Sequence, residues 1–341
     1  MRFSIYPTDT PEVIEEVLDL ASNGGDRLVF TSLHIPESEN LKKYLDFLKA
    51  QVAHGFTFFA DISPLALERL SLSYNTISTL EKYGIVGLRL DFGFSLDEIR
   101  QIAKSGIPIA VNASTVDEQL IDALKTCNLV GWHNYYPRPE TGLGEAYFLR
   151  QSALFTECGL PLYGFIPGEK NFRAPLYKGL PMLESQRYKN AYRNFVEMQH
   201  LCQKCEIFCA EGAVHKDHFE WIRLFETENV LTLPLSYIDN VLAPKLLNHV
   251  FTIRKEETDF SVRLEGTREA INAEKFLQGE CRAYGSVQMD TALFARYQGE
   301  IHIMTRDVCL TDAQTRVAEI ADPYKKLVDF ITGGSKIRFV V

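Results

Sequence analysis

Residues 27–62 read RLVFTSLHIPESENLKKYLDFLKAQVAHGFTFFADI, with two apolar runs on either side of a longer segment. The runs, Arg27–Leu33 and Phe56–Ile62, are apolar along most of their length, which is typical of parallel strands buried on both faces. Between them, Leu41–Ala53 places apolar residues at the spacing of one helix face. The stretch therefore predicts a strand, a helix and a second, parallel strand.

This unit recurs along the first 235 residues. Six further runs have the length and composition of buried strands: Phe3–Tyr6, Val86–Asp91, Ile107–Asn112, Leu129–Asn134, Leu160–Ile166 and Glu206–Ala210. Helical patterns lie at Pro11–Ala21, Leu96–Lys104, Val116–Leu124, Ala146–Cys158 and Tyr192–Cys202. Eight units in succession predict an α/β fold, a TIM (β/α)8 barrel, over residues 1–235. A doubly wound open sheet is the alternative, but no G-x-G-x-x-G sequence follows the first run.

The pattern changes after about residue 235, and we expect a small β-rich domain over residues 245–341. Its runs are rich in β-branched and aromatic residues, or alternate between apolar and polar ones. The expected strands are Val250–Arg254, Phe260–Leu264, Arg282–Met289, Ala292–Tyr297, Glu300–Thr305 and Ile337–Val341. One helix is expected near Asp322–Thr332.

Composition limits the partners of the chain. The 341 residues include 46% hydrophobic and 24% charged residues, as in ordinary globular proteins, and the net charge is −9. An acidic chain is a poor candidate for binding nucleic acid or an anionic membrane. No apolar stretch is long enough to span a bilayer, and the N-terminus turns polar at once. We therefore expect a cytoplasmic protein, with a homodimer left open.

The cysteines raise the question of a metal site. Seven cysteines are scattered along the chain, an odd count that favours a reducing compartment over a disulfide framework. Cys202, Cys205 and Cys209, with His200 nearby, have C-x2-C-x3-C spacing, but no second group of ligands follows. We expect buried thiols at these positions, and neither a metal nor a cofactor.

Polar residues stand at nearly every predicted strand end. In a TIM barrel the chemistry collects at the carboxyl ends of the strands, and polar groups buried there without a partner would be costly. The strand ends predict a site that includes Tyr6, Ser32, His34, Asp61, Arg89, Asp91, Asn112, His133, Asn134 and Glu211.

Two loops add further candidates. Residues 131–145 contain Arg138 and Glu140 among several Pro and Gly residues, and residues 168–187 contain Arg173, Glu184 and Arg187. Barrels often bind phosphate with the loops after strands 7 and 8, and a guanidinium suits phosphate or carboxylate. The alternatives are a rigid surface turn for the first loop and a solvated charged loop for the second.

The carboxyl groups indicate chemistry. Asp91 follows Arg89 on one strand face, and this Arg could keep Asp91 ionised. Residues 87–91, GLRLD, also resemble the strand-4 pattern of α-amylase-type glycosidases, in which the Asp is the nucleophile. Glu184, Glu211 or Asp61 would then be the protonated acid. A structural Arg–Asp pair remains open for Asp91, and a helix N-cap for Asp61.

Longer motifs occur in a specific order. They are SIYP at 4–7, TSLHIPE at 31–37, DISP at 61–64, LRLDFGF at 88–94, NAST at 112–115, HNYYPRPETGL at 133–143 and PLYKGLP at 175–181. With GSVQMD at 285–290 and RYQGE at 296–300, they resemble the bacterial 6-phospho-N-acetylmuramidase family, formerly labelled an uncharacterised outer surface protein. The resemblance spans the whole chain.

The resemblance implies a TIM barrel followed by a cyclophilin-like β domain. It also implies cleavage of the β-1,4 bond of intracellular MurNAc-6-phosphate–GlcNAc, a peptidoglycan-recycling intermediate. That substrate carries a phosphate and a lactyl carboxylate, which fits Arg138, Arg173 and Arg187. After Gly-Leu-Pro the family reads Thr-x-Glu-x-His-Arg, whereas here Met182 and Gln186 replace the Thr and the His. If that His touched substrate, specificity would differ here.

Two other functions remain open. One is a non-catalytic phosphosugar-binding protein, although such a site has little use for several acids. The other is a phosphosugar isomerase or lyase on the same barrel. A Schiff-base aldolase needs a Lys at a strand end, and none of the eight predicted ends has one.

Overall fold

The computed structural model describes residues 1–35, 41–256, 258–268, 282–309 and 313–341. Within it the chain forms two compact units, Met1–Phe219 and Glu220–Val341. Pro36 and Glu37, which end one of the motifs, lie outside the described residues. None of the helices in these ranges combines the length and the apolar composition needed to cross a membrane.

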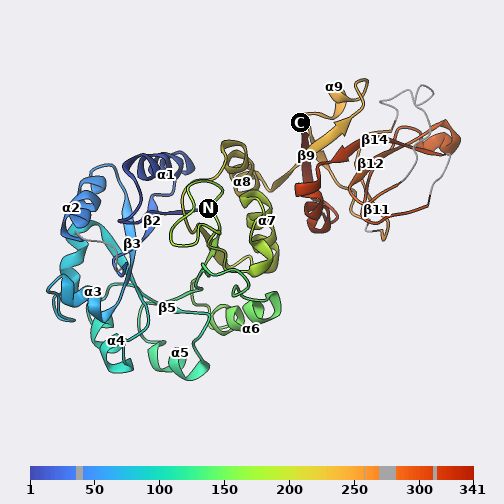
Figure 1. The fold of residues 1–341 in the computed structure, drawn as a ribbon. Coiled ribbons are helices and arrows are strands. Elements are labelled where there is room, and N and C mark those ends of the chain that lie inside the picture. The colour runs from blue at the N-terminus through green and yellow to red at the C-terminus, as the bar shows by residue number, and fades with distance from the viewer. Residues whose placement is uncertain (36–40, 257, 269–281, 310–312) are drawn as a thin grey trace. The chain divides into compact units, whose positions relative to one another are not determined.

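The first unit is a barrel of eight strands, and neighbouring strands are parallel throughout (Figure 1). The strands are β1 Phe3–Ser4, β2 Leu28–Ser32, β3 Thr57–Ile62, β4 Ile85–Leu90, β5 Ile109–Asn112, β6 Leu129–Trp132, β7 Leu162–Ile166 and β8 Cys205–Cys209. Arg2 joins the first strand to the last, because its N–H donates to Ile207 O (2.9 Å) and its carbonyl accepts from Cys209 N (2.8 Å). The predicted TIM barrel and its eight strands are confirmed.

Helices follow the strands around the barrel (Figure 1). They are α1 Pro11–Gly24, α2 Leu41–Val52, α3 Pro64–Arg69, α4 Leu96–Ala103, α5 Glu118–Leu124, α6 Glu145–Thr156, α7 Ala191–Leu201 and α8 Lys216–Glu228, with 3-10 segments at Ile77–Tyr83 and Glu184–Gln186. Thr10 caps α1 and Ser63 caps α3, each before a Pro that suits the first helical turn. Two of these helices were not predicted from the sequence: α3, whose six residues are too few to show a helical period, and α8.

Aromatic rings fill the barrel interior. Trp132 is fully buried, and its ring centroid lies 4.6–4.9 Å from those of Phe208, Tyr163, Phe30 and Phe59. A Cβ at Gly87 would lie 2.3 Å from the ring of Phe59, so only glycine fits beside it on β4. This dense core fixes the strand ends above it, because rings packed on several sides cannot shift independently.

The second unit is built on one mixed sheet in the order β10-β15-β9-β14-β12-β13-β11. The strands are β9 Val230–Ile238, β10 Val250–Thr252, β11 Ser261–Arg263, β12 Ser286–Asp290, β13 Ile301–Met304, β14 Gln314–Ile320 and β15 Lys336–Val340. The short helix α9 spans Ala243–Leu246, and 3-10 segments span Ala292–Tyr297 and Asp322–Phe330. A β-rich unit after the barrel is confirmed.

Three details of the second unit differ from the sequence analysis. Ala292–Tyr297 was expected to be a strand, which is wrong, because Thr291 caps a 3-10 turn there. The strands β9 and β14 were not expected at all. β9 pairs in parallel with β15, over a hundred residues later, so no local signal marks the pairing. The division between the two units falls between Phe219 and Glu220, within α8, whereas the composition of the sequence changes near 235–245.

Candidate functional site

One group of polar side chains lies at the carboxyl ends of β2, β3 and β4. Arg89 Nη1 lies 2.9 Å from Asp61 Oδ1 and 4.0 Å from Asp91 Oδ1, so one guanidinium faces two carboxyl groups. His34 Nε2 lies 3.6 Å from Asp91 Oδ2, on the other side of that carboxyl group. We call Asp61, Arg89, Asp91 and His34 the Asp–Arg cluster.

Strand register and a helix cap hold the Asp–Arg cluster in place. Asp61 and Arg89 are directly paired across β3 and β4, so their side chains leave the same face of the sheet side by side. His34 Nδ1 lies 2.7 Å from Ser63 Oγ, and that hydroxyl also accepts from Ala66 N as the cap of α3. Because Ser63 caps this helix, the N-cap alternative for Asp61 is wrong.

The two carboxyl groups occupy different environments. Burial raises the pKa of Asp61 to about 6; Arg89 opposes this shift and the nearby Asp91 adds to it. The Asp91 side chain is 21% exposed, against 9% for Asp61. Among the described residues, Nε and Nη2 of the buried Arg89 have no hydrogen-bond partner, so this cation keeps donors available. A pair with one drier and one wetter carboxyl group suits acid–base work.

A second group surrounds Arg173, in the loop after β7. The Arg173 guanidinium carbon lies 3.4 Å from the ring centroid of Tyr6, and Nη1 donates to Tyr135 OH at 3.4 Å. The Arg173 backbone N–H donates to Glu211 Oε2 at 2.7 Å. The cation is therefore held over the β1 end by an aromatic face and by its own backbone.

Glu211 and Asp9 are the buried acids of this second group. Burial raises the pKa of Glu211 to about 7, partly offset by the amide of Arg173. The Leu180 amide also lies near this carboxyl group, but Oε1 has no hydrogen-bond partner in the described part of the chain. Burial raises the pKa of Asp9 to about 6, and its carboxylate accepts from Tyr6 N at 2.8 Å. Glu211 is fully buried, and its carboxylate contacts the loop after β7 through the Arg173 amide.

Glu184 and Arg187 form a clamp between the loops after β6 and β7. Arg187 Nε and Nη2 donate to the two oxygens of Glu184 at 2.6 and 2.7 Å. Its remaining N–H groups reach backbone carbonyls of both loops, those of Tyr136, Arg138, Lys178 and Gly179. Arg187 is 4% exposed, and these contacts occupy all five of its donors. The expected contact of Arg187 with an anionic substrate group therefore has no free donor to rest on.

Both carboxylate oxygens of Glu184 also accept several hydrogen bonds. Besides Arg187, its oxygens accept from Glu140 N (2.9 Å) and Gly142 N (2.8 Å). The hydrogen bonds from Arg187 lower the pKa of Glu184 to about 2. A carboxyl group with so low a pKa is poorly suited to donate a proton, so Glu184 is the least favoured of the candidate acids.

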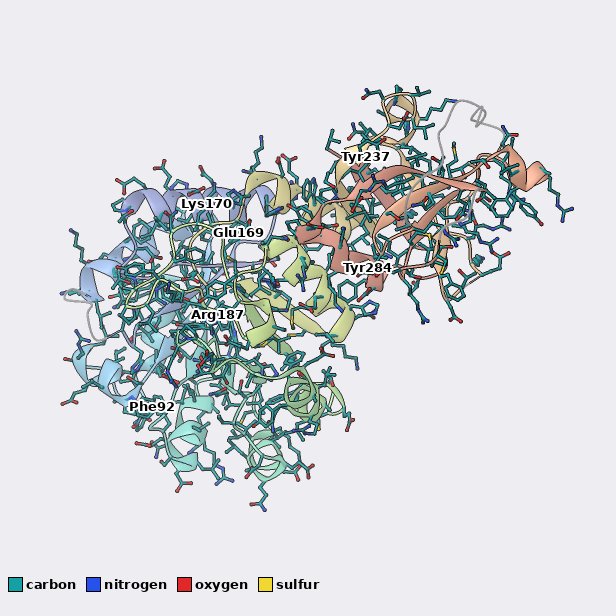
Figure 2. All side chains as sticks on the ribbon, turned by 45° about the vertical axis from the view of Figure 1, so that its right-hand side comes forward. Phe92, Glu169, Lys170, Arg187, Tyr237 and Tyr284 are labelled. Atoms are coloured by element: carbon teal, nitrogen blue, oxygen red, sulfur yellow. The ribbon has the colours of Figure 1, made fainter. Side chains whose placement is uncertain are left out.

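The first residues of the same loop are also anchored. Glu169 accepts from Ala191 N (2.9 Å) and from His215 N (2.7 Å), and its Oε1 lies 2.6 Å from His218 Nδ1. Lys170 donates to Glu16 of α1 at 3.0 Å. Figure 2 shows Glu169, Lys170 and Arg187 spread along the loop that covers this side of the barrel. These contacts hold the loop in place on its side of the site.

Several of the predicted binding residues make hydrogen bonds within the protein. His133 is fully buried between Ser114 Oγ and Ser152 Oγ, both at 3.1 Å, and burial lowers its pKa to about 3. Ser32, Asn112 and Asn134 each accept a backbone N–H within two residues, which shapes the turns after their strands. Glu140 contributes its backbone N–H to the clamp, and Arg138 is exposed on the same loop.

The structure adds residues that the sequence analysis did not select. Asp9 and Ser63 looked like turn and cap residues, and Tyr135 was one of two neighbouring tyrosines in the loop after β6. Asp9 could have been selected from the sequence, because it lies three residues beyond Tyr6, the predicted end of the first strand. Met182 and Gln186, the departures from the family motif, are fully buried, with Met182 Sδ 3.1 Å from a Cβ placed at Gly164. Neither side chain is exposed to solvent.

Metal binding finds little support in the described residues. Their one group of three suitable ligands is Asp290, Glu300 and His302, in the second unit. Glu300 already receives hydrogen bonds from Arg254 and Arg268, at 2.9–3.0 Å. Two adjacent guanidinium groups oppose a cation, so this group does not fit a metal.

Comparisons with known proteins cover the whole chain. The family model described as 6-phospho-N-acetylmuramidase, N-terminal, matches residues 2–223, and that described as 6-phospho-N-acetylmuramidase, C-terminal, matches residues 232–340. A conserved protein of unknown function from Enterococcus faecalis is 26% identical, with a TM-score of 0.85 over 100% of this chain and 96% of that one. An uncharacterized B. cereus protein is 20% identical, with a TM-score of 0.78 over 100% of both chains. Curated proteins gave no match.

Proposed function

The chain belongs to the 6-phospho-N-acetylmuramidase family, a family of glycosidases in MurNAc-6-phosphate recycling, and we propose that Asp61 and Asp91 are its reacting carboxyl groups. Glycosidases commonly place two carboxyl groups on either side of the scissile bond, one protonated and one ionised. The observation that carries the proposal is the single Arg89 nitrogen that faces both carboxyl groups at the barrel mouth.

Asp61 is the proton donor in this proposal. Burial raises its pKa to about 6, so a proton is available near neutral pH. When the glycosidic C–O bond breaks, the leaving oxygen takes the Asp61 proton. The new carboxylate then lies 2.9 Å from Arg89, which stabilises the charge as it forms.

Asp91 supplies the electron pair on the other side of the bond. Its Oδ1 lies 4.0 Å from Arg89 Nη1, and its side chain is more exposed than that of Asp61, so it is the carboxyl group that water and substrate can reach. Asp91 either attacks the anomeric carbon directly or takes a proton from an attacking water. The anomer first released from the substrate distinguishes these two routes, because a covalent intermediate retains the configuration and direct water attack inverts it.

In this proposal Arg173 and Arg138 bind the anionic groups of the substrate. Arg173 stands over the β1 end beside Tyr6 and Tyr135, and Arg138 is exposed on the neighbouring loop. The loops after β7 and β8 are a common phosphate position in this fold. Because the substrate is a recycling intermediate, we also propose a cytoplasmic location. The net charge of −9 supports a protein that does not bind nucleic acid.

The test is release of GlcNAc from MurNAc-6-phosphate–GlcNAc by Asp91→Asn. The change is nearly isosteric, so we expect kcat to fall by about 100-fold or more while substrate binding persists. Asp97→Asn is the matched control, since Asp97 is 88% exposed on α4 and should leave kcat unchanged. If Asp91→Asn keeps more than about a tenth of the wild-type kcat, Asp91 is a structural ion-pair partner.

A further inference from the structure

Phe92, the residue after Asp91, presents its ring to solvent. It is 78% exposed, more than any other phenylalanine in the described residues. Single exposed rings are common on protein surfaces, and the position of this one, next to a proposed catalytic group, is what suggests a ligand that covers it. Figure 2 shows Phe92 at the edge of the barrel, well apart from Arg187, Glu169 and Lys170.

The ring is presented by a rigid turn. On one side, Asp91 N donates to Ile62 O at 3.0 Å, and on the other, Ser95 and Glu98 form the capping box that starts α4. Gly93 between them has φ +101°, a conformation that favours glycine. The position of Phe92 therefore follows from strand β4 and helix α4.

The ring of His34, which belongs to the Asp–Arg cluster, packs against Phe92. The centroids of His34 and Phe92 lie 6.0 Å apart at an interplanar angle of 86°, an edge-to-face contact. His34 itself is held by Ser63 and lies against Asp91. The Phe92 ring is thus aligned with the Asp–Arg cluster through a chain of direct contacts.

We propose that Phe92 is the stacking platform for the leaving-group sugar, a binding subsite that rests on the proposed function. The two sugars of the substrate differ in charge, because one carries the phosphate and the lactyl carboxylate whereas GlcNAc is neutral. The charged sugar requires cations, which stand at Arg173 and Arg138. A neutral pyranose presents a face of C–H groups, and these are attracted to the face of an aromatic ring.

Orientation follows from this assignment. Asp61 and Asp91 act on the bond between the sugars, so the GlcNAc ring must lie within one sugar width of them. Phe92 adjoins Asp91 in the chain, and its uncharged ring matches a sugar that carries no charge. The substrate then runs from Arg173, across the Asp–Arg cluster, to Phe92.

The test compares two substrates. One is MurNAc-6-phosphate–GlcNAc, and the other is the methyl β-glycoside of MurNAc-6-phosphate, which has the same scissile bond but no second sugar. We expect Phe92→Ala and Phe92→Leu to lower kcat/KM for the disaccharide by about five- to tenfold, the worth of one aromatic contact. Inhibition by free GlcNAc should weaken by the same factor. Both variants should cleave the methyl glycoside as fast as the wild type cleaves it.

Two further variants complete the design. Phe92→Trp keeps an aromatic face and should stay within about twofold of wild type, whereas Phe260→Ala removes another exposed ring, 56% exposed, and should change nothing. The proposal is overturned if Phe92→Ala and Phe92→Leu cleave the disaccharide with the kcat/KM of the wild type. It is equally overturned if their kcat/KM falls by the same factor for the disaccharide and the methyl glycoside. It is also overturned if the variants abolish a concentration-dependent self-association, because a second copy then covers the ring. Failure of the wild type to release GlcNAc refutes the proposed function instead.

Discussion

Replacing Glu184 by Gln tests whether the Glu184–Arg187 pair is a structural clamp. The substitution keeps the size and one acceptor oxygen of the side chain but removes its charge. Arg187 would then remain buried, with backbone carbonyls around it but without its counter-charge. We expect a less stable barrel and a loosened pair of loops.

The magnitude follows from the pKa of Glu184. A fall from 4.5 to about 2 corresponds to at most about 3 kcal/mol in favour of the ionised form. Because the side chain is 31% exposed, solvent screening reduces this value, and we expect a loss of about 2 kcal/mol. For a unit of this size, that loss lowers Tm by about 4–8 °C.

The contribution of Glu184 to stability depends on pH in a predictable direction. The folded-state pKa of Glu184 lies below its unfolded value, so its contribution is complete above pH 4.5 and is lost as the pH falls towards 2. The stability difference between wild type and Glu184→Gln should therefore be constant near neutral pH and shrink below pH 4.5.

The two tryptophans permit a selective assay. Trp132 is buried in the barrel core, whereas Trp221 contacts Tyr324 in the second unit. In a Trp221→Phe background, denaturant unfolding followed by fluorescence reports on the barrel alone. Asp122→Asn, on the barrel helix α5, is the control for removing a carboxylate elsewhere, because the Asp122 side chain is 74% exposed. If Glu184→Gln unfolds at the wild-type denaturant concentration and instead weakens binding of the phosphorylated substrate alone, the clamp interpretation is refuted.

Three further predictions concern the site. Asp61→Asn should remove the proton donor, so kcat should fall and the loss of activity as the pH rises through about 6 should disappear; an unchanged pH profile would contradict this. Arg173→Ala should raise KM for the phosphorylated disaccharide by about tenfold or more and affect an unphosphorylated analogue much less, and equal effects would exclude an anion-binding role. The folded-state pKa of His133 is lowered to about 3, so its contribution to stability is complete above pH 6.5 and is lost towards pH 3; His133→Gln should flatten acid unfolding over that range, as circular dichroism would show.

The sequence by itself determined the barrel. Parallel strands covered on both faces must be apolar along their whole length, and the helices between them must repeat apolar residues every third or fourth position. Both signals are local, so all eight strands and most of the longer helices could be predicted, although α8 was not among them. The positions of Asp61, Arg89 and Asp91 at strand ends were equally predictable, because a barrel brings all its strand ends to one rim.

Tertiary structure alone decided which polar residues remain available to a substrate. Arg173 and Arg187 are alike in composition and lie in one loop, yet Arg187 is saturated by Glu184 and four carbonyls, whereas Arg173 stands over Tyr6. His133 and His34 both follow strands, but His133 faces helix α6 and His34 faces Asp91. These differences depend on contacts between residues far apart in the chain, and hydrogen-bond partners of that kind leave no periodic trace in the sequence.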